Sequence, residues 1–219
     1  MFTDAMTLFL DNRDIYFTGL GNTVKASLIS LILALLLGIL VAALRYYSRG
    51  LLARCLAGYV SVVRNTPLLI QIYFIFFGLP SLGITLSAFE TGLFALTFNS
   101  TAYVSEIILG ALRAIPDGQR EAAQALSLGK STALCRVLLP QSAELAVPAV
   151  CGQFVQLIKD TSLLYTISVF EITKAADDVA NTTYAYLEAF LVGGMLYLVV
   201  CMTLNVLVDL LEMRLRKAR

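Results

Sequence analysis

Residues 26–44 read ASLISLILALLLGILVAAL, a run in which no residue carries a charge. About 20 consecutive apolar residues are enough for an α-helix to cross the ~30 Å hydrocarbon core of a bilayer. A second uncharged run, AFLVGGMLYLVVCMTLNVLV at residues 189–208, lies near the C-terminus. The two runs predict an all-α membrane protein that is anchored in the bilayer near both ends of the chain.

The composition of the whole chain also points to lipid as its surroundings. Of the 219 residues, 58% are hydrophobic and 14% are charged, whereas a soluble domain has about a quarter charged residues. The net charge of +1 gives no reason to expect nucleic acid as a partner. The chain has no His and no CxxC pair, so we expect neither a metal site nor a disulfide among Cys55, Cys135, Cys151 and Cys201.

Three further apolar segments carry one or two charged residues each. A buried helix of a soluble protein can have this composition, but a chain anchored at both ends favours membrane spans. We therefore expect one transmembrane domain, residues 1–219, with five spans at about residues 20–45, 56–79, 88–112, 145–170 and 188–211. The charged residues of the three middle apolar stretches, 56–79, 91–112 and 145–169, are Arg64, Glu106, Lys159 and Asp160.

The distribution of Lys and Arg predicts the orientation of the spans. Cytoplasmic loops of membrane proteins carry an excess of basic residues. Such residues gather after the first span, in the polar region 113–144 and in the C-terminal RLRKAR, whereas acidic residues dominate the other side. The N-terminus is therefore expected outside, with region 113–144 and the C-terminus in the cytoplasm. The first 19 residues have no basic n-region, so we expect the first span to be an uncleaved insertion signal.

The polar region 113–144 is expected to form two short helices. Asp117, which follows Pro116, is in a position to cap the first helix, and Gly129 is a suitable left-handed stop. A second helical piece is expected from residue 132 to 139, with Pro140 at its end. Composition alone leaves two roles open, an amphipathic helix in the headgroup region and a docking site for a partner.

The GKST at residues 129–132 does not predict a phosphate-binding loop. In that motif, GxxxxGK[ST], the loop follows a strand, and its backbone amides surround the phosphates. Here Gln124 occupies the position of the first Gly, and a predicted helix precedes the motif. We expect no catalytic residue and no cofactor on this chain; if the protein uses ATP, another subunit binds it.

Several motifs together resemble one family of membrane proteins. Glu121-Ala122-Ala123, with VLLP at the expected spacing, resembles the cytoplasmic loop of permease subunits of bacterial ATP-binding-cassette (ABC) importers. Three other stretches resemble the polar amino acid uptake subfamily: RNTPLLIQIYFIFFGLP at 64–80, STAYVSEIILGALRAIPDGQREAA at 100–123 and LIKDTSLLYTIS at 157–168. The likeness runs from about residue 17 to 212.

This resemblance implies a type I ABC-importer transmembrane domain with a coupling helix in the cytoplasmic loop 113–144. It implies a multi-pass protein of the bacterial cytoplasmic (inner) membrane that pairs with itself or with a paralogue. Further implied partners are two ATPase subunits, which bind ATP and Mg, and an extracytoplasmic binding protein that delivers an amino acid. The implied coupling residues are Glu121, Ala122, Ala123, Ser127, Gly129, Leu139 and Pro140, with Ser127 where the family usually has Gly.

A predicted break in the second span is the first candidate for a substrate site. Arg64 lies ten residues beyond Arg54 of the basic loop, which corresponds to roughly 15 Å along a helix. Pro67 disfavours helical structure at Thr66, so a new half-helix would begin at Pro67 and present its amide end. Both that end and the Arg64 guanidinium suit a carboxylate.

Polar residues also recur on one face of the third span and on one face of the fourth. With the residues at the break they form the substrate-pathway candidates: Arg64, Thr66, Asn99, Tyr103, Glu106, Gln153, Gln156 and Asp160. They could line a pathway at a dimer axis, with Asp160 or Glu106 facing an α-amino group. In the alternative interpretation, Arg64, Lys159, Asp160 and Glu106 pair with one another and only fix the packing.

The sequence therefore predicts a transport subunit rather than an enzyme. The main hypothesis is the transmembrane permease subunit of an ATP-driven importer that translocates an amino acid. The alternatives are a permease of the same superfamily for another small polar solute and a non-transporting membrane scaffold. Because acidic and basic residues offset each other within the spans, the side-chain class of the solute stays open.

Overall fold

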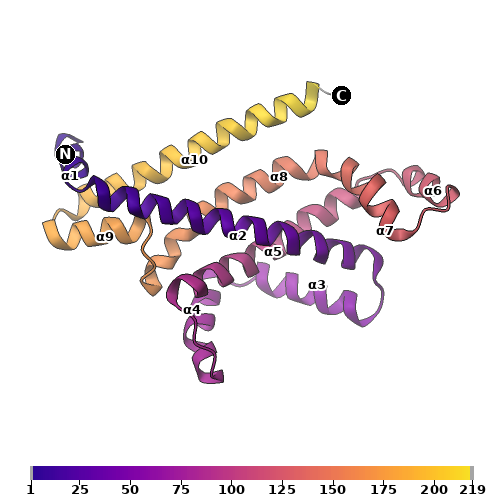
Figure 1. Ribbon diagram of the computed structural model, residues 1–219, viewed down its shortest axis with the longest axis horizontal. Helices are drawn as coiled ribbons and strands as arrows, with labels where there is room; N and C mark the ends of the chain where they lie inside the picture. The colour runs from indigo at the N-terminus through magenta and orange to yellow at the C-terminus, as the bar shows by residue number, and fades with distance from the viewer. Residues whose placement is uncertain (1, 218–219) are drawn as a thin grey trace.

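A computed structural model describes residues 2–217, and every regular element in this range is helical (Figure 1). The side chains of the C-terminal RLRKAR lie outside the described residues. The elements are, in chain order, α1 (Phe2–Asp11), α2 (Arg13–Tyr47), α3 (Leu51–Arg64), α4 (Leu68–Gly78), the 3₁₀ turn η1 (Leu79–Leu82), α5 (Ala88–Arg113), α6 (Asp117–Ala125), α7 (Lys130–Ala133), the π-helical turn η2 (Leu134–Leu138), α8 (Leu139–Asp160), the 3₁₀ turn η3 (Thr161–Ile167), α9 (Ile172–Thr183) and α10 (Tyr186–Lys217).

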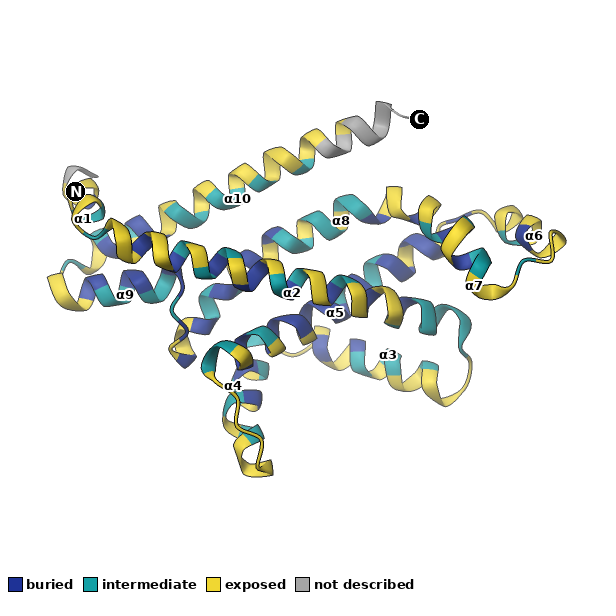
Figure 2. Cartoon of the chain, in the orientation of Figure 1, coloured by how far each residue is buried: buried dark blue, intermediate teal, exposed yellow. Residues whose placement is uncertain are grey.

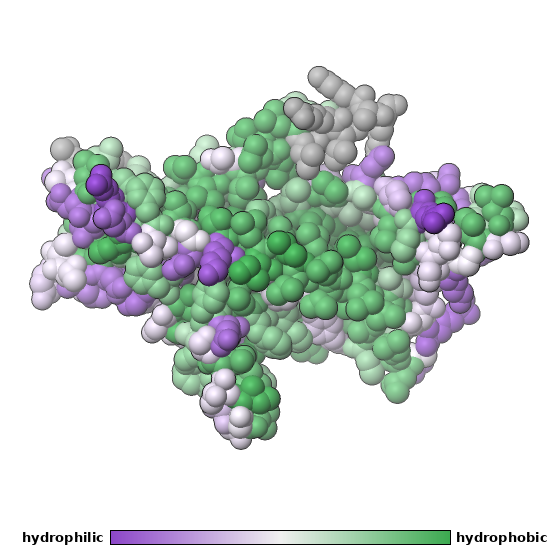
Figure 3. Space-filling model, viewed as in Figure 1, coloured by the Kyte–Doolittle hydropathy of each residue, from purple (hydrophilic) through white to green (hydrophobic). Residues whose placement is uncertain are grey.

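Among the described residues, four helical segments are long and apolar enough to cross a membrane: Arg13–Tyr47, Ala88–Arg113, Lys130–Ile167 and Tyr186–Leu210. A fifth candidate is the pair Leu51–Arg64 and Leu68–Leu82, which is bent by 106°. The surface in Figure 3 is apolar over the middle of the molecule and hydrophilic at two ends, one over α1 and α9 and the other over α6. The segment between α5 and α8 thus lies at the end of the molecule opposite to α9.

The central helix is α5. In its apolar 18-residue stretch 67% is buried inside the molecule, whereas the corresponding share in α10 is 11% (Figure 2). A Cβ atom on Gly38 of α2 would lie 2.6 Å from Val104 Cγ1 on α5, so this close approach requires glycine. In a bilayer, helices associate through such close contacts, because the surrounding lipid is as apolar as the side chains. The buried face of α2 is accordingly built from small residues at every fourth position: Ala26, Ser30, Ala34, Gly38 and Ala42.

A buried carboxylate joins α9 to α10. Glu171 is 1% exposed, and it accepts hydrogen bonds from the backbone amides of Thr173 at 2.9 Å and Lys174 at 2.8 Å. The Tyr197 hydroxyl of α10 donates a third bond at 2.5 Å. Burial raises the pKa of the Glu171 carboxyl, and the bond from Tyr197 opposes that rise. Glu171 therefore caps α9 and fixes that helix on α10 at the same time.

The start of α6 differs from the prediction. Pro116 occupies the N-cap position and makes no side-chain capping bond, so the expectation that Asp117 caps the helix is wrong. Asp117 is instead the first helical residue, and its carboxylate pairs with Arg120 at 2.8 Å. An acidic residue still stabilises the first turn from this position, because it interacts favourably with the helix dipole.

The end of α6 also lies earlier than predicted. Ser127 has a left-handed backbone with φ of 53°, whereas Gly129 has φ of −62° and precedes α7. The Leu128 amide donates to the Ala123 carbonyl at 3.1 Å and the Ser127 amide to the Gln124 carbonyl at 2.8 Å. These two bonds form a Schellman motif, which normally has glycine at the left-handed position. The predicted stop at Gly129 is therefore wrong, and Ser127 provides it.

Pro140 does not end the second helix as predicted. The helical segment continues from Lys130 to Ile167, with the π-helical turn η2 directly before α8. In this turn the Leu139 amide donates to the carbonyl of Leu134, five residues earlier. Pro140 lies in the first turn of α8. A wider turn at this point accommodates a residue that lacks an amide hydrogen and that crowds the preceding turn of a regular helix.

We predict that Ser127→Gly stabilises the end of α6. A left-handed conformation costs a non-glycine residue about 1 kcal/mol, so the variant is expected to slow amide hydrogen exchange at residues 127 and 128. Gly129→Ala is the matched control, because its φ of −62° is ordinary and no atom lies within 4 Å of an added Cβ. If Ser127→Gly left amide hydrogen exchange unchanged and Gly129→Ala accelerated it, the left-handed turn would be at Gly129.

Candidate functional site

The predicted break in the second apolar segment is present. Helix α3 ends at Arg64, α4 begins at Leu68 after Pro67, and the axes of the two segments differ by 106°. Proline causes this break, because its ring excludes helical backbone at the preceding residue, Thr66, and it has no amide to donate. The break leaves the last carbonyls of α3 without helical partners.

Side chains next to the break donate additional hydrogen bonds to two carbonyls in the last turn of α3, which also accept the Asn65 backbone amide. Asn65 Nδ2 donates to the Ser61 carbonyl at 2.7 Å, and Thr66 Oγ1 donates to the Val62 carbonyl at 3.0 Å. In hydrocarbon an unsatisfied backbone group costs several kcal/mol, so irregular backbone survives there only with such partners or next to a water-filled cavity.

Gln71 closes the break and connects it to the central helix. Its Nε2 donates to the Val63 carbonyl at 2.9 Å and to the Thr66 carbonyl at 3.1 Å. Its Oε1 accepts from Asn99 Nδ2 of α5 at 3.2 Å. The sequence analysis missed Gln71, although an amide within the apolar stretch LLIQIYFIFF is the signal that could have revealed it.

A polar cavity of about 520 Å³ lies at this break. Its walls come from the α3–α4 junction, α5 and α8, so segments far apart in sequence meet there. Every predicted pathway residue except Glu106 lines it, together with three residues that were not predicted. The complete lining is Arg64, Asn65, Thr66, Pro67, Leu68, Asn99, Tyr103, Gln153, Gln156 and Asp160.

The polar cavity contains one cationic and one anionic side chain, and among the described residues neither takes part in an ion pair. The Arg64 guanidinium lies over the Tyr103 ring, 5.3 Å from its centroid. The Asp160 carboxylate accepts a hydrogen bond from Gln156 Nε2 at 2.8 Å. The amide end of α4 adds partial positive charge next to Leu68. Such a cavity can hold a small solute that carries both charges.

Glu106 lies in a second space, the neighbouring cavity, of about 340 Å³. Its Oε2 is 2.7 Å from Nη1 of Arg45, in the last turn of α2. The alternative interpretation, in which Arg64, Lys159, Asp160 and Glu106 pair with one another, names the wrong partner for Glu106: this carboxylate forms an ion pair, but with Arg45. The close packing of α2 on α5 brings Arg45 to it, and the sequence analysis had counted Arg45 only as part of the basic loop.

The EAA segment lies at the opposite end of the molecule from α9 (Figure 1). The Arg120 side chain holds α6 in place: it lies over the Tyr46 ring at 5.6 Å and donates to the Ile115 carbonyl at 3.1 Å. Ala123 is buried beneath the helix, whereas Leu126 is 73% exposed. Of the predicted coupling residues Leu139 is half-buried, and the exposed ones are Glu121, Ala122, Ser127, Gly129 and Pro140.

Comparison with known families identifies the chain. The model of a family described as "Binding-protein-dependent transport system inner membrane component" matches residues 34–217. The chain belongs to this family. The resemblance inferred from the EAA segment and the accompanying motifs is thereby confirmed.

Individual relatives match this chain over almost its full length. It is 32% identical to the probable glutamine ABC transporter permease protein GlnM of Bacillus subtilis (strain 168), covering 97% of this chain and 99% of that protein. It is 33% identical to the arginine transport system permease protein ArtQ of the same organism, covering 90% and 91%. A crystal structure of an amino acid ABC transporter with histidines matches with a TM-score of 0.87 at 30% identity, covering 94% and 96%.

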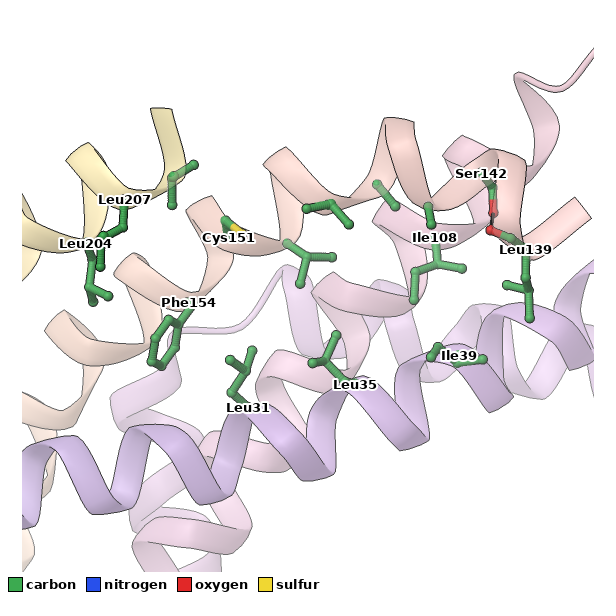
Figure 4. A pocket seen from close by; sticks show the side chains of 15 residues that line it. Leu31, Leu35, Ile39, Ile108, Leu139, Ser142, Cys151, Phe154, Leu204 and Leu207 are labelled. Atoms are coloured by element: carbon green, nitrogen blue, oxygen red, sulfur yellow. Dashed lines mark hydrogen bonds between the residues drawn. The ribbon is translucent and has the colours of Figure 1, made fainter. Parts of the chain in front are cut away.

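The chain has a further cavity of about 450 Å³ between α2, α8 and α10 (Figure 4). Apolar side chains such as Leu35, Phe154 and Leu204 line it, and no charged residue does. The Ser142 hydroxyl is already bonded to the Leu139 carbonyl at 3.0 Å. This apolar cavity therefore has no group that would bind a charged solute, in contrast to the polar cavity.

We predict that Gln71→Leu destabilises this chain by about 1 kcal/mol, the net contribution of a typical hydrogen bond, because the groups that lose their partners are only partly buried. The change removes the donors to two carbonyls of the break and the acceptor for Asn99. A lowered melting temperature of the purified complex in detergent would be the evidence. Gln141→Leu is the control, because its amide bonds only in exposed positions, to the Val137 carbonyl and to Gln119. Equal losses in both variants would contradict the role given to Gln71.

Proposed function

We propose that this chain is the transmembrane permease subunit of an ATP-driven ABC importer and that its solute is an amino acid. The observation that carries the proposal is the pair of unpaired opposite charges, Arg64 and Asp160, in the polar cavity. The names of the relatives, which concern glutamine, arginine and amino acids in general, support the same solute class.

The proposed binding mode follows from the chemistry of the cavity walls. The α-carboxylate of the solute pairs with the Arg64 guanidinium and with the amide end of α4. The α-ammonium group pairs with Asp160. The remaining amides, Gln153 and Gln156, face the side chain of the solute. A volume of about 520 Å³ lies within the range of roughly 300–1,000 Å³ that is usual for small-molecule sites.

The proposed topology has five spans, with the bent pair α3–α4 as one of them. The N-terminus is outside, and region 113–144 and the C-terminus are in the cytoplasm of a bacterial cell. The basic residues near α6 and the acidic residues around α9 support this orientation in the inner membrane. A second permease subunit, identical or paralogous, completes the pathway, and an extracytoplasmic binding protein delivers the amino acid.

Helix α6 is the proposed coupling helix. Its exposed Glu121, Ala122 and Leu126 form the surface that docks on an ATPase subunit. Two such subunits would bind ATP and Mg, so the chain itself is a transport subunit without catalytic residues. Because Arg120 and Ala123 hold α6 on the helices behind it, a movement of the ATPase displaces those helices as well.

We predict that Glu121→Lys detaches the ATPase subunits and reduces amino acid uptake at least tenfold. Charge reversal in a docking surface places like charges together or leaves a desolvated charge unpaired. Glu121 is exposed, so the melting temperature of the permease subunit is expected to stay unchanged. Co-purification of the ATPase with tagged permease is the measurement. Glu188→Lys, at the opposite end of the molecule, is the control, and retention of the ATPase by both variants would exclude this docking surface.

We predict that Arg64→Gln raises the KM for the amino acid by about 10- to 100-fold, the loss expected for a hydrogen bond to a charged group. The assay is ATPase activity of the complex in liposomes with its binding protein and with L-glutamine, L-arginine and the other common amino acids in turn. Arg49→Gln, an exposed arginine outside both cavities, is the control. Stimulation of the wild type by no amino acid would overturn the solute class, and an unchanged KM in Arg64→Gln would overturn the binding mode.

A further inference from the structure

The polar cavity and the neighbouring cavity share a wall. Arg64, Asn65 and Tyr103 line both of them. Arg64 therefore faces two spaces, one lined also by Asp160 and the other lined also by Glu106. Its partner determines whether it is available to a solute.

Three ionisable groups surround the neighbouring cavity, and only two of them are paired. Arg45 and Glu106 are in contact at 2.7 Å, and their side chains are 13% and 35% exposed. The third group, Arg64, has no carboxylate partner among the described residues and lies over the Tyr103 ring instead. Glu106 and both guanidinium groups line one space of about 340 Å³, so Arg64 is the remaining cation of this space when Arg45 is removed.

We propose that Arg45 is a positioning residue, because it binds Glu106 and thereby keeps Arg64 free for the carboxylate of the solute. This inference rests on the proposed binding mode, in which Arg64 contacts the solute. With Arg45 in place, its charge and that of Glu106 cancel, and Arg64 and Asp160 remain to match a zwitterion. Without Arg45, Glu106 pairs with Arg64, and the cavity loses its free cation and gains a net negative charge.

The test is a set of double-mutant comparisons in the liposome ATPase assay, with the amino acid that stimulates the wild type, L-glutamine being tried first. Arg45→Gln is expected to raise KM by about 10-fold or more and to leave the maximal rate within about twofold. Replacing Glu106 as well, in Arg45→Gln/Glu106→Gln, is expected to restore a KM close to that of the wild type. Arg45→Lys keeps the charge and should behave like the wild type.

The decisive comparison is the effect of Arg64→Gln in each background. It should be large in the wild type, less than about threefold in Arg45→Gln, and large again in Arg45→Gln/Glu106→Gln. A purely structural role of Arg45 would leave the effect of Arg64→Gln equal in all three backgrounds, and this result would overturn the inference while the binding mode stands. No effect of Arg64→Gln in the wild type would overturn the binding mode itself.

A further comparison covers the case in which Arg45→Gln alone does not assemble. Glu106→Gln removes the competing carboxylate, so its KM should stay close to that of the wild type. Adding Arg45→Gln to it should then change nothing, because Arg45 has no carboxylate left to hold. A higher KM in the double variant than in Glu106→Gln would mean that Arg45 contacts the solute directly, and it would overturn the inference.

Discussion

A carbonyl group that has lost its helical partner in a bilayer must find another donor, and the site described above depends on this constraint. Pro67 interrupts the second apolar segment, and Gln71 supplies a bond to the Val63 carbonyl, which has lost its helical partner. Asn65 and Thr66 add bonds to carbonyls in the last turn of α3. Because Gln71 also bonds to Asn99, the break is fixed to the central helix. The polar cavity is the space that this fixed break leaves open.

The close packing of α2 on α5 has an electrostatic consequence as well. Small residues on α2, Gly38 above all, let the two helices approach until a Cβ atom would clash with Val104. The same approach places Arg45 within 2.7 Å of Glu106. Contacts between uncharged helix faces thus determine which arginine pairs with the acidic residue and which one stays free at the cavity.

Features that depend on local pattern were predictable from the sequence. The uncharged runs, the break at Pro67 and the polar stripes through Asn99 and Gln153 follow from length, proline chemistry and helical periodicity. Features that depend on neighbours were not. The partner of Glu106 depends on the register between α2 and α5, which the sequence of one helix does not contain. The left-handed residue at Ser127 is a local feature that was also missed, because glycine alone does not fix where the last backbone bonds of a helix close.

The π-helical turn η2 determines the direction in which the side chains of the C-terminal half of α8 face. A π turn holds one residue more than an α turn, and each residue advances a helix by about 100°. The side chains of Gln153, Gln156 and Asp160 are therefore rotated by about that angle, compared with their positions on an uninterrupted α-helix that starts at Lys130. Without the extra residue, the amides and the carboxylate would be turned by about 100° from their present direction toward the polar cavity. A local widening next to Pro140 thus sets the angular alignment of a site several helical turns away.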